Sequence, residues 1–245
     1  MKKLLEKIRQ ERGFDFTQYR LCHLERRIGA RLKANSLQTY EAYSCFLDEH
    51  PDEFAKLFNT LLIHVTEFFR NPKAWEVIKK EVLPEIIQSK EARGLKTIRL
   101  WSAGCSTGEE TYTAAICLQK VLGERLYDFK IKIYGTDLDK KGLAQAMEGR
   151  YEKQSLVVED RLRLCTQFRV HDMVTQEPLK NIDLLICRNV VIYFTKELQE
   201  KICRNFFRAL NPGGFLMLGI SESLPATMRD HFRSIDSRER IFQKR

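Results

Sequence analysis

The feature that most constrains the fold of this 245-residue chain is an alternation that begins after about residue 94. From there, short apolar runs are separated by longer amphipathic stretches. This pattern is typical of a mainly parallel sheet with helices on both faces, because parallel neighbours need a crossover that is usually a helix. The predicted strands are 98–103, 132–137, 168–172, 183–189 and 214–220. Two later tracts, 231–235 and 239–243, are predicted to close the sheet as antiparallel edge strands.

Residues 1 to about 80 show helical periodicity and no convincing strand. Apolar residues recur at intervals of three, four and four residues, at Leu21, Leu24, Ile28 and Leu32. This spacing predicts a helix that Asn35 closes. A basic stripe with the same spacing begins one residue earlier and consists of Arg20, His23, Arg27 and Arg31. Further helices are predicted over 40–47 and 54–63, with Pro51 in a first turn. We therefore expect an all-helical domain over 1–75 and an α/β domain over 76–245.

Composition limits where the chain works and what it binds. It has no apolar run near the roughly 18 residues of a membrane helix and no signal-peptide pattern, so we expect a cytoplasmic protein without membrane insertion. The seven cysteines show no CxxC pair and no zinc spacing, so no metal site is predicted. The net charge of +9 predicts an acidic partner and leaves nucleic acid, an anionic membrane face and an acidic protein open.

The sharpest local motif is WSAGCSTGEETY, residues 101–112, at the end of the first predicted strand. Gly104 and Gly108 allow a tight turn close to a ligand, and the next helix offers free amide groups at its N-terminus. The spacing is neither GxGxxG nor GxxxxGK[ST], which disfavours a dinucleotide or nucleoside triphosphate. Glu110 is a candidate ligand residue, although with Thr107 it also fits a capping box.

Polar residues follow the later strands in the same way. Asp137 suits the hydroxyls of a ribose, and its alternative role as a helix cap could be filled by Asp139. Asp172 and Met173 follow the third strand and suit the amino group and ring of an adenine. Asn189 ends the fourth strand, where a buried amide needs a partner. Because these positions share one edge of a parallel sheet with the glycine turn, one nucleoside could contact all of them.

Five ordered blocks resemble the chemotaxis receptor methyltransferases of the CheR type. They are HVTEFFRNPKAW (64–75), WSAGCSTGEE (101–110), GTDLD (135–139), CRNVVIYF (187–194) and GGFLMLGISESL (213–224). The resemblance implies a class I, Rossmann-like S-adenosylmethionine-dependent methyltransferase domain preceded by a small all-α domain. It also implies methyl transfer to glutamate side chains in the acidic, helical cytoplasmic domain of chemoreceptors, with S-adenosylhomocysteine as the other product.

The resemblance also assigns site residues. It implies that the cofactor contacts His64, Thr66, Arg70, Gly104, Glu110, Asp137, Asp172, Met173, Asn189 and Val190. Arg70 and Tyr193 stand nearest the transferred methyl group by the same comparison. His64 replaces the family's usual asparagine, and Thr111 replaces a proline. An ionised carboxylate needs no general base, so we expect Arg70 to bind one oxygen of the substrate carboxylate. The alternatives are a contact with the cofactor's own carboxylate and a structural ion pair.

The expected receptor contacts come from the basic stripe, in particular Arg20, Arg27 and Arg31, unless that stripe is an ordinary solvated helix face. Segment 150–168 is mostly helical in pattern and is shorter than the family's β-rich subdomain, so docking of a receptor tail is not expected. A monomer is expected.

Three other functional classes fit parts of the sequence less well. A nucleic-acid methyltransferase fits the charge, but 188–191 reads Arg-Asn-Val-Val in place of the Asn/Asp-Pro-Pro-aromatic tetrad of amino-methylating enzymes. A non-catalytic sensor of S-adenosylmethionine or its product would not need Arg70 and Tyr193. A nicotinamide oxidoreductase lacks its glycine fingerprint.

Overall fold

The computed structural model describes residues 1–12, 15–61, 65–151 and 156–245, and the chain forms two compact units. The smaller unit consists of Met1–Ile63 together with Tyr193–Leu198. The larger unit consists of His64–Ile192 and Gln199–Arg245. The division falls earlier in the chain than the predicted boundary at 75–76, and a short later segment returns to the smaller unit.

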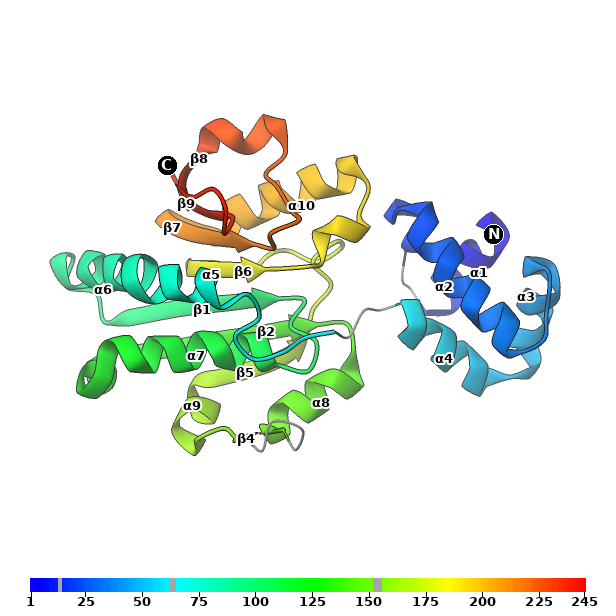
Figure 1. Cartoon of the computed structure of the whole chain (residues 1–245), viewed down its shortest axis with the longest axis horizontal. Coiled ribbons are helices and arrows are strands. Elements are labelled where there is room, and N and C mark those ends of the chain that lie inside the picture. Colours follow the sequence, from blue (N-terminus) through cyan, green and yellow to red (C-terminus); the bar gives the residue numbers. More distant parts are fainter. Residues whose placement is uncertain (13–14, 62–64, 152–155) are drawn as a thin grey trace. The chain divides into compact units, whose positions relative to one another are not determined.

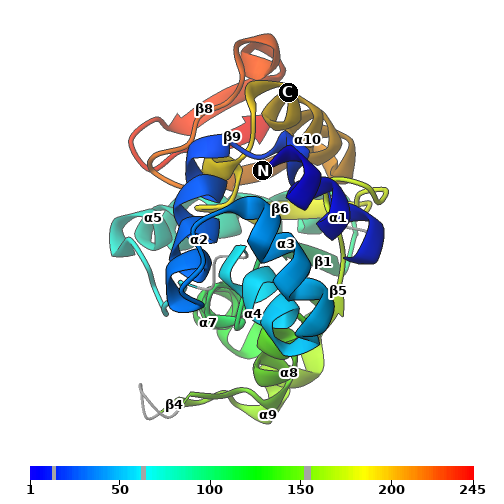
Figure 2. The same ribbon diagram turned by 90° about the vertical axis from the view of Figure 1, so that its right-hand side faces the viewer.

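The smaller unit is helical throughout its N-terminal part (Figures 1 and 2). Its elements are α1 (Lys2–Arg12), the short η1 (Phe16–Gln18), α2 (Leu21–Ala34), α3 (Tyr40–Glu49) and α4 (Pro51–Leu61). The predicted helices are confirmed over the described residues, and residues 62–63, the predicted end of the last helix, lie outside them. The observed helix ends follow the expected chemistry. Asn35 ends α2, the Thr39 side chain accepts from the Ala42 amide at 3.1 Å to begin α3, and Pro51 is the first residue of α4.

The larger unit is built on a seven-stranded sheet, which confirms the predicted fold class (Figure 1). Its strands are β1 (Thr97–Ala103), β2 (Lys130–Asp137), β5 (Thr166–Val170), β6 (Ile182–Cys187), β7 (Leu210–Leu218), β8 (Phe232–Asp236) and β9 (Ile241–Lys244). The order is β5-β2-β1-β6-β7-β9-β8, and the first five strands run parallel. The two late tracts do close the sheet: β9 pairs antiparallel with both β7 and β8, and β8 forms the edge.

Helices cover both faces of this sheet. The helical elements after residue 64 are α5 (Pro72–Val77), the π-helical η2 (Ile78–Val82), α6 (Leu83–Ala92), α7 (Glu109–Leu122), the short η3 (Gly123–Asp128), α8 (Lys140–Glu148), α9 (Asp160–Cys165), the short η5 (Val191–Tyr193), α10 (Lys196–Ala209) and the short η6 (Ala226–His231). Tyr193–Leu198, in η5 and α10, belong to the smaller unit. Alternate residues of β1 serve the two faces. Leu100 joins the core formed with α5, α6 and α7, whereas the Trp101 ring meets Phe206 of α10 edge-on at 6.1 Å.

Segment 150–168 differs from its mostly helical prediction. Its described residues contain a two-stranded ladder of β3 (Arg150–Tyr151) and β4 (Leu156–Val157), and only Asp160–Cys165 is helical before β5 begins. Tyr151 explains part of the difference. Its buried ring packs edge-on against Phe68 at 4.9 Å, and its hydroxyl donates to the Thr107 carbonyl at 2.7 Å. These long-range contacts outweigh the local helical pattern.

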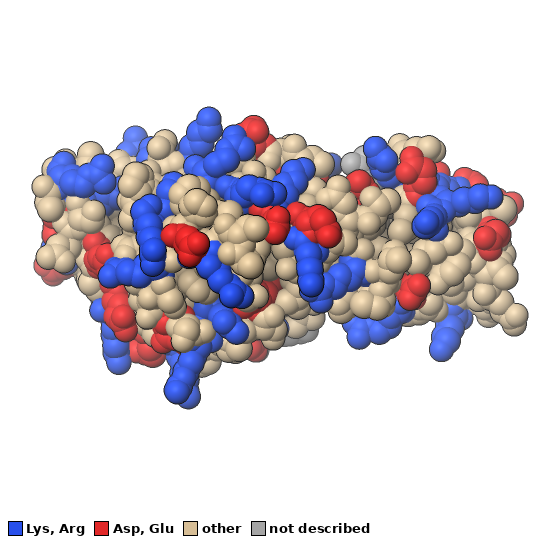
Figure 3. Space-filling view, turned by 90° about the horizontal axis from the view of Figure 1, so that it is seen from above, with Lys and Arg blue, Asp and Glu red and all other residues tan. Residues whose placement is uncertain are grey.

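The surface and the helix lengths bear on the expected partners. Figure 3 shows Lys and Arg side chains spread over the visible face and interspersed with Asp and Glu, so the positive charge on this face does not form one continuous patch. Among the helices of the described residues, none is long and apolar enough to cross a membrane. In the same residues, no group of three or more His, Cys, Asp or Glu side chains is arranged to hold a metal ion.

Candidate functional site

The candidate site lies at the carboxyl edge of β1, β2 and β6, where the glycine turn follows β1. Gly104 has a φ of +78°, and a Cβ there would lie 2.6 Å from Cγ2 of Val190, so only glycine fits. The Gly104 and Cys105 amides both donate to the Thr136 carbonyl of β2, at 2.8 and 3.0 Å. The turn is thus tied to the neighbouring strand and to the segment after β6, and it brings the predicted residues Gly104 and Val190 into contact.

Asp137 ends β2 with its carboxylate fixed by backbone amides. It accepts from Ser106 at 2.8 Å, from Leu138 at 2.7 Å and from Asp139 at 2.9 Å. The alternative role of helix cap belongs to Asp139, whose side chain accepts from the Lys141 and Gly142 amides at the start of α8. Asp137 is therefore held at the strand end without being the cap of α8, which leaves the ribose interpretation standing.

Glu110 does not form the capping box. Thr107 donates instead to Glu109, at 2.6 Å, whereas the buried Glu110 accepts from the Ser102 hydroxyl at 2.9 Å. One Arg188 guanidinium nitrogen lies 3.5 Å from the other Glu110 oxygen. Burial raises the pKa of Glu110, although Arg188 and Ser102 act in the opposite direction. The residue is thus a buried carboxyl group of the sheet edge, and no helix cap competes for it.

Asn189 and Val190 form a turn after β6 that is held by Glu222. The Glu222 carboxylate is buried and accepts from four backbone amides: Gly219 at 2.6 Å, Asn189 at 3.0 Å, Val190 at 2.9 Å and Ile192 at 3.3 Å. Asn189 adopts a left-handed φ of +59°. Its side-chain oxygen is buried and has no hydrogen-bond partner among the described residues, so it is free to accept from a ligand.

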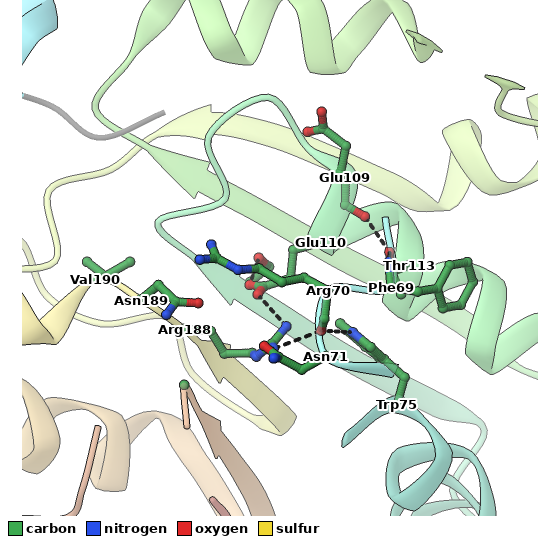
Figure 4. A network of polar contacts seen from close by, with 12 residues as sticks. Phe69, Arg70, Asn71, Trp75, Glu109, Glu110, Thr113, Arg188, Asn189 and Val190 are labelled. Carbon is green, nitrogen blue, oxygen red and sulfur yellow. Dashed lines mark hydrogen bonds and ion pairs between the residues drawn. The ribbon is translucent and has the colours of Figure 1, made fainter. Parts of the chain in front are cut away.

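Arg70 lies in a turn before α5 that approaches the same edge (Figure 4). Its guanidinium donates to the Val65 carbonyl at 3.0 Å, and in Figure 4 it extends toward the side on which Asn189 and Val190 lie. The Arg70 carbonyl accepts from Arg188 at 2.8 Å and from the Trp75 indole at 3.1 Å. Through Arg188, the structure therefore connects the turn that carries Arg70 with Glu110 and with the segment after β6.

The remaining residues predicted to bind the cofactor are Asp172, Met173, Thr66 and His64. Asp172 accepts from the Val174 amide at 2.8 Å and the Thr175 hydroxyl at 2.7 Å, so its carboxylate shapes the turn after β5. Met173 and Thr66 are partly exposed. His64 lies outside the described residues.

Four of the predicted site residues belong to the smaller unit: Arg20, Arg27, Arg31 and Tyr193. The Tyr193 ring meets His23 of α2 edge-on at 5.1 Å, and its carbonyl accepts from the Arg20 amide at 2.8 Å. Arg20 is exposed and donates to the Phe194 carbonyl at 3.1 Å. Arg27 donates to a carbonyl of α4, that of Thr60.

The last residue of the basic stripe, Arg31, forms its contacts within the smaller unit. It donates to the buried Glu53 at 2.9 Å, and Glu53 also accepts from the Tyr43 hydroxyl at 2.8 Å and from Asn35 at 2.9 Å. Burial opposes the charge on Glu53, yet the bonds from Arg31, Tyr43 and Asn35 leave its pKa below the ordinary value. Arg31 thus stabilises the packing of α2, α3 and α4.

The sequence reasoning missed two residues that organise the edge, Arg188 and Glu222. Both stood inside blocks that carried the family resemblance, next to Asn189 in one case and in the GISESL run in the other. The available signal was a charged residue beside an apolar strand, which needs a buried partner.

The parallel sheet, the glycine turn and the polar strand ends together define a nucleoside-binding α/β domain of the methyltransferase class. Residues 64–241 match the family model described as "CheR methyltransferase, SAM binding domain", and residues 1–62 match "CheR methyltransferase, all-alpha domain". The chain belongs to the CheR methyltransferase family. The expected cofactor, S-adenosylmethionine, is confirmed by the same domain.

The chain is also similar in sequence to individual methyltransferases. The chain is 33% identical over 239 residues to a "Chemotaxis protein methyltransferase" of Listeria innocua, covering 89% of this chain and 87% of that protein. It is 31% identical over 269 residues to the "Putative methyltransferase Cher3" of Pseudomonas putida, covering 98% and 95%. Among solved structures, the [4+2]-cyclase SpnF aligns with 56% of this chain and 43% of its own, at 21% identity and a TM-score of 0.36, too low a similarity to indicate function.

Proposed function

We propose that this protein transfers the methyl group of S-adenosylmethionine to glutamate carboxylates of a chemoreceptor's cytoplasmic domain, giving glutamate methyl esters. It is then a protein-glutamate O-methyltransferase. The observation that supports this proposal is the sheet edge of a CheR-type SAM binding domain, where Asp137 ends β2, Glu110 bonds to Ser102 of β1, and Asn189 follows β6 with a side-chain oxygen that has no partner among the described residues. Nucleic-acid methylation and a sensor without catalysis are not favoured by the chemotaxis methyltransferases among its relatives.

The residues of the edge fit this cofactor. Asp137 would accept from the ribose hydroxyls, because its carboxylate is already oriented by backbone amides. The Asn189 oxygen would accept a hydrogen bond from the cofactor, because no described residue donates one to it. Gly104 leaves the space that a side chain would fill beside Val190. We further assign Thr66, Glu110, Asp172, Met173 and Val190 to the same binding site, and His64 on the basis of the family block alone.

Methyl transfer to a carboxylate depends chiefly on how the two reacting groups are positioned. When bound, S-adenosylmethionine supplies a methyl group on a positively charged sulfur. A glutamate carboxylate is ionised near pH 7 and attacks without a general base. Arg70 is proposed to hold one carboxylate oxygen so that the other faces the methyl carbon, since a guanidinium N–H donates a strong, charge-assisted hydrogen bond to a carboxylate oxygen. Tyr193, which belongs to the smaller unit, is assigned to the reacting groups on the basis of the family block alone.

The partner is proposed to be an acidic helix that approaches the basic side of α2. Arg20 is exposed and thus available to glutamates, and Arg27 lies about two helical turns further along the same stripe. Arg31 is committed to Glu53 and contributes mainly to the fold. Such contacts would weaken as salt increases, because exposed charges are screened over about 8 Å at physiological ionic strength. The proposed setting is the cytoplasm, with the protein as a monomer of two domains, a helical one and a methyltransferase one.

The test is transfer of tritium from methyl-labelled S-adenosylmethionine to a purified cytoplasmic chemoreceptor fragment. Base treatment should release the counts as volatile methanol, because a carboxyl methyl ester hydrolyses and an amine or ring methyl group does not. Arg70→Lys keeps the charge but loses the planar fork, and should lower kcat by roughly 10-fold or more, in line with loss of an oriented contact. Arg208→Lys, an exposed arginine of α10 paired with Glu177, is the matched control.

Total RNA in the same reaction supplies the competing acceptor. Base-stable counts in RNA would move the substrate to nucleic acid. Binding of S-adenosylhomocysteine without transfer to either acceptor would support the sensor instead.

A further inference from the structure

A buried arginine beside the candidate site has no role in the function proposed above. Arg188 follows β6, is 5% exposed, and lies among segments that are distant in the sequence. We infer that Arg188 is a positioning residue, which sets the conformation of the Phe69–Asn71 turn and thereby places Arg70 for methyl transfer. This inference rests on the proposed function, because that function gives Arg70 its task.

The contacts of Arg188 converge on this turn (Figure 4). One terminal nitrogen donates to the Arg70 carbonyl at 2.8 Å and to the Asn71 side-chain oxygen at 2.6 Å. The guanidinium carbon lies 5.7 Å from the centre of the Trp75 ring, and Trp75 donates its indole N–H to the same Arg70 carbonyl at 3.1 Å. Arg188 therefore contacts both the central residue of the turn and the residue after it.

The turn needs such support because its backbone is unusual. Phe69 and Asn71, on either side of Arg70, have φ values of +53° and +58°. Side-chain-bearing residues rarely adopt this left-handed region, and a bulky phenylalanine does so only when its surroundings impose it. The Phe69 amide donates to the Thr113 hydroxyl at 3.2 Å, which fixes the turn at its first residue. Arg188 and Trp75 fix it at the next two.

The fork of Arg188 also faces the sheet edge. Its other terminal nitrogen lies 3.5 Å from Glu110, so one planar group spans the turn that carries Arg70 and a proposed cofactor residue. This contact suggests a rival role, in which Arg188 only neutralises the buried Glu110 charge. The two roles differ in what they require: neutralisation needs a positive charge, whereas positioning needs the fixed fork of a guanidinium.

Arg188→Lys separates these roles, because lysine keeps the positive charge and loses the planar guanidinium with its fixed N–H donors. The kinetic test is a double-mutant cycle with Arg70→Ala, in which kcat for receptor methylation is measured in four proteins. With Arg70 present, Arg188→Lys should lower kcat by at least 10-fold. With Arg70 removed, it should lower kcat by less than 3-fold, because there is no longer a guanidinium to place. Equal losses in both backgrounds overturn the inference.

A structural readout accompanies the kinetics. Hydrogen exchange of the peptide that spans 65–75 should become faster in Arg188→Lys, whereas peptides of β1 and β7 should keep the parent rates. Exchange that is unchanged over 65–75 also overturns the inference. If Arg188→Lys does not fold, Asn71→Gly takes its place, since glycine adopts the left-handed φ of +58° while the change removes one acceptor of Arg188 and leaves Arg188 intact. Arg208→Lys, on the surface of α10, is the control for an arginine-to-lysine change.

The failure of the proposed function is recognised separately. If the parent transfers no methyl group to the receptor, the cycle is measured instead as the dissociation constant of S-adenosylhomocysteine by titration calorimetry. The same pattern, a loss of 10-fold or more that vanishes without Arg70, then supports positioning without any reference to the methyl acceptor. Additive losses in that constant count against it.

Discussion

The buried carboxylate of Glu222 offers a sharp test of how the edge is held. Oε2 accepts from the Gly219 and Asn189 amides, and Oε1 accepts from those of Val190 and Ile192. Glu222→Gln keeps the shape of the side chain but replaces one of these oxygens with an NH2 group, which can only donate. Two of the four amides then face a donor, whichever way the carboxamide turns.

The expected destabilisation follows from these contacts. A buried donor left without an acceptor costs about 1–3 kcal/mol, so two of them cost roughly 2–6 kcal/mol. Part of this is offset, because burial raises the pKa of Glu222 and thus already disfavours its charged form, which glutamine avoids. We therefore expect a net loss of about 2–4 kcal/mol in the free energy of unfolding. In a protein of this size each kcal/mol lowers Tm by about 2–4 °C, which gives a fall of roughly 4–16 °C.

The assay is thermal unfolding followed by circular dichroism, with S-adenosylhomocysteine affinity measured on the same samples. Affinity should fall as well, because Glu222 holds the turn that presents the Asn189 oxygen. Glu200→Gln is the matched control: Glu200 pairs with Arg204 on the surface of α10, where such a change is worth at most about 1 kcal/mol. A Tm within about 1 °C of the parent, with unchanged affinity, would refute the claim that these four bonds hold the turn.

Three further predictions concern other parts of the structure. Gly104→Ala should weaken S-adenosylhomocysteine binding at least 10-fold by calorimetry, because its Cβ would lie 2.6 Å from Val190 at a φ of +78°; unchanged binding would contradict the tight turn. Asp137→Asn should raise the same dissociation constant about 10- to 100-fold, or about 1.4–2.8 kcal/mol, through loss of a ribose acceptor. Glu53→Gln should lower the free energy of unfolding by about 1–3 kcal/mol at pH 7 by denaturant titration, through loss of the charged bond to Arg31. Because the folded-state pKa of Glu53 is lowered from 4.5, its contribution is present above pH 4.5 and is lost as the pH falls through the folded value; a pH-independent difference would count against it.

The elements that could be predicted from sequence are those set by local periodicity. The alternation after residue 94 placed all seven strands of the main sheet, and the spacing of Leu21 to Leu32 placed α2. The end of each strand also placed the polar residues on one edge, because parallel strands end on the same side. Sequence alone left Asp137 and Asp139 as rivals for the cap of α8. The structure decides this through the bonds of Asp139 to the Lys141 and Gly142 amides.

The parts that could not be predicted depend on partners far away in the chain. Arg188 bonds to Arg70, 118 residues earlier, and Glu222 bonds to Asn189, 33 residues earlier. No periodicity reports such pairs. Arg31 shows the converse: its place in a basic stripe suggested an exposed docking residue, and only the fold reveals that Glu53, 22 residues later, takes up its guanidinium.

At this edge of the sheet, strained turns are repeatedly held by charged side chains. This explains why charged groups lie where only ligand-binding residues were predicted from the sequence. Three turns meet there, and each contains a residue other than glycine with a left-handed backbone: Ser106 after β1, Phe69 and Asn71 around Arg70, and Asn189 after β6. Such conformations cost of order 1–3 kcal/mol each and persist only where surrounding contacts impose them. Each turn is held by a different charged group, namely Asp137, Arg188 and Glu222 in the same order. Asp137 and Glu222 accept from main-chain amides, and Arg188 donates to the Arg70 carbonyl and to the Asn71 side chain. Because these contacts lie within the protein, the positions of the turns are set before any ligand arrives, and binding need not bear the cost of ordering them.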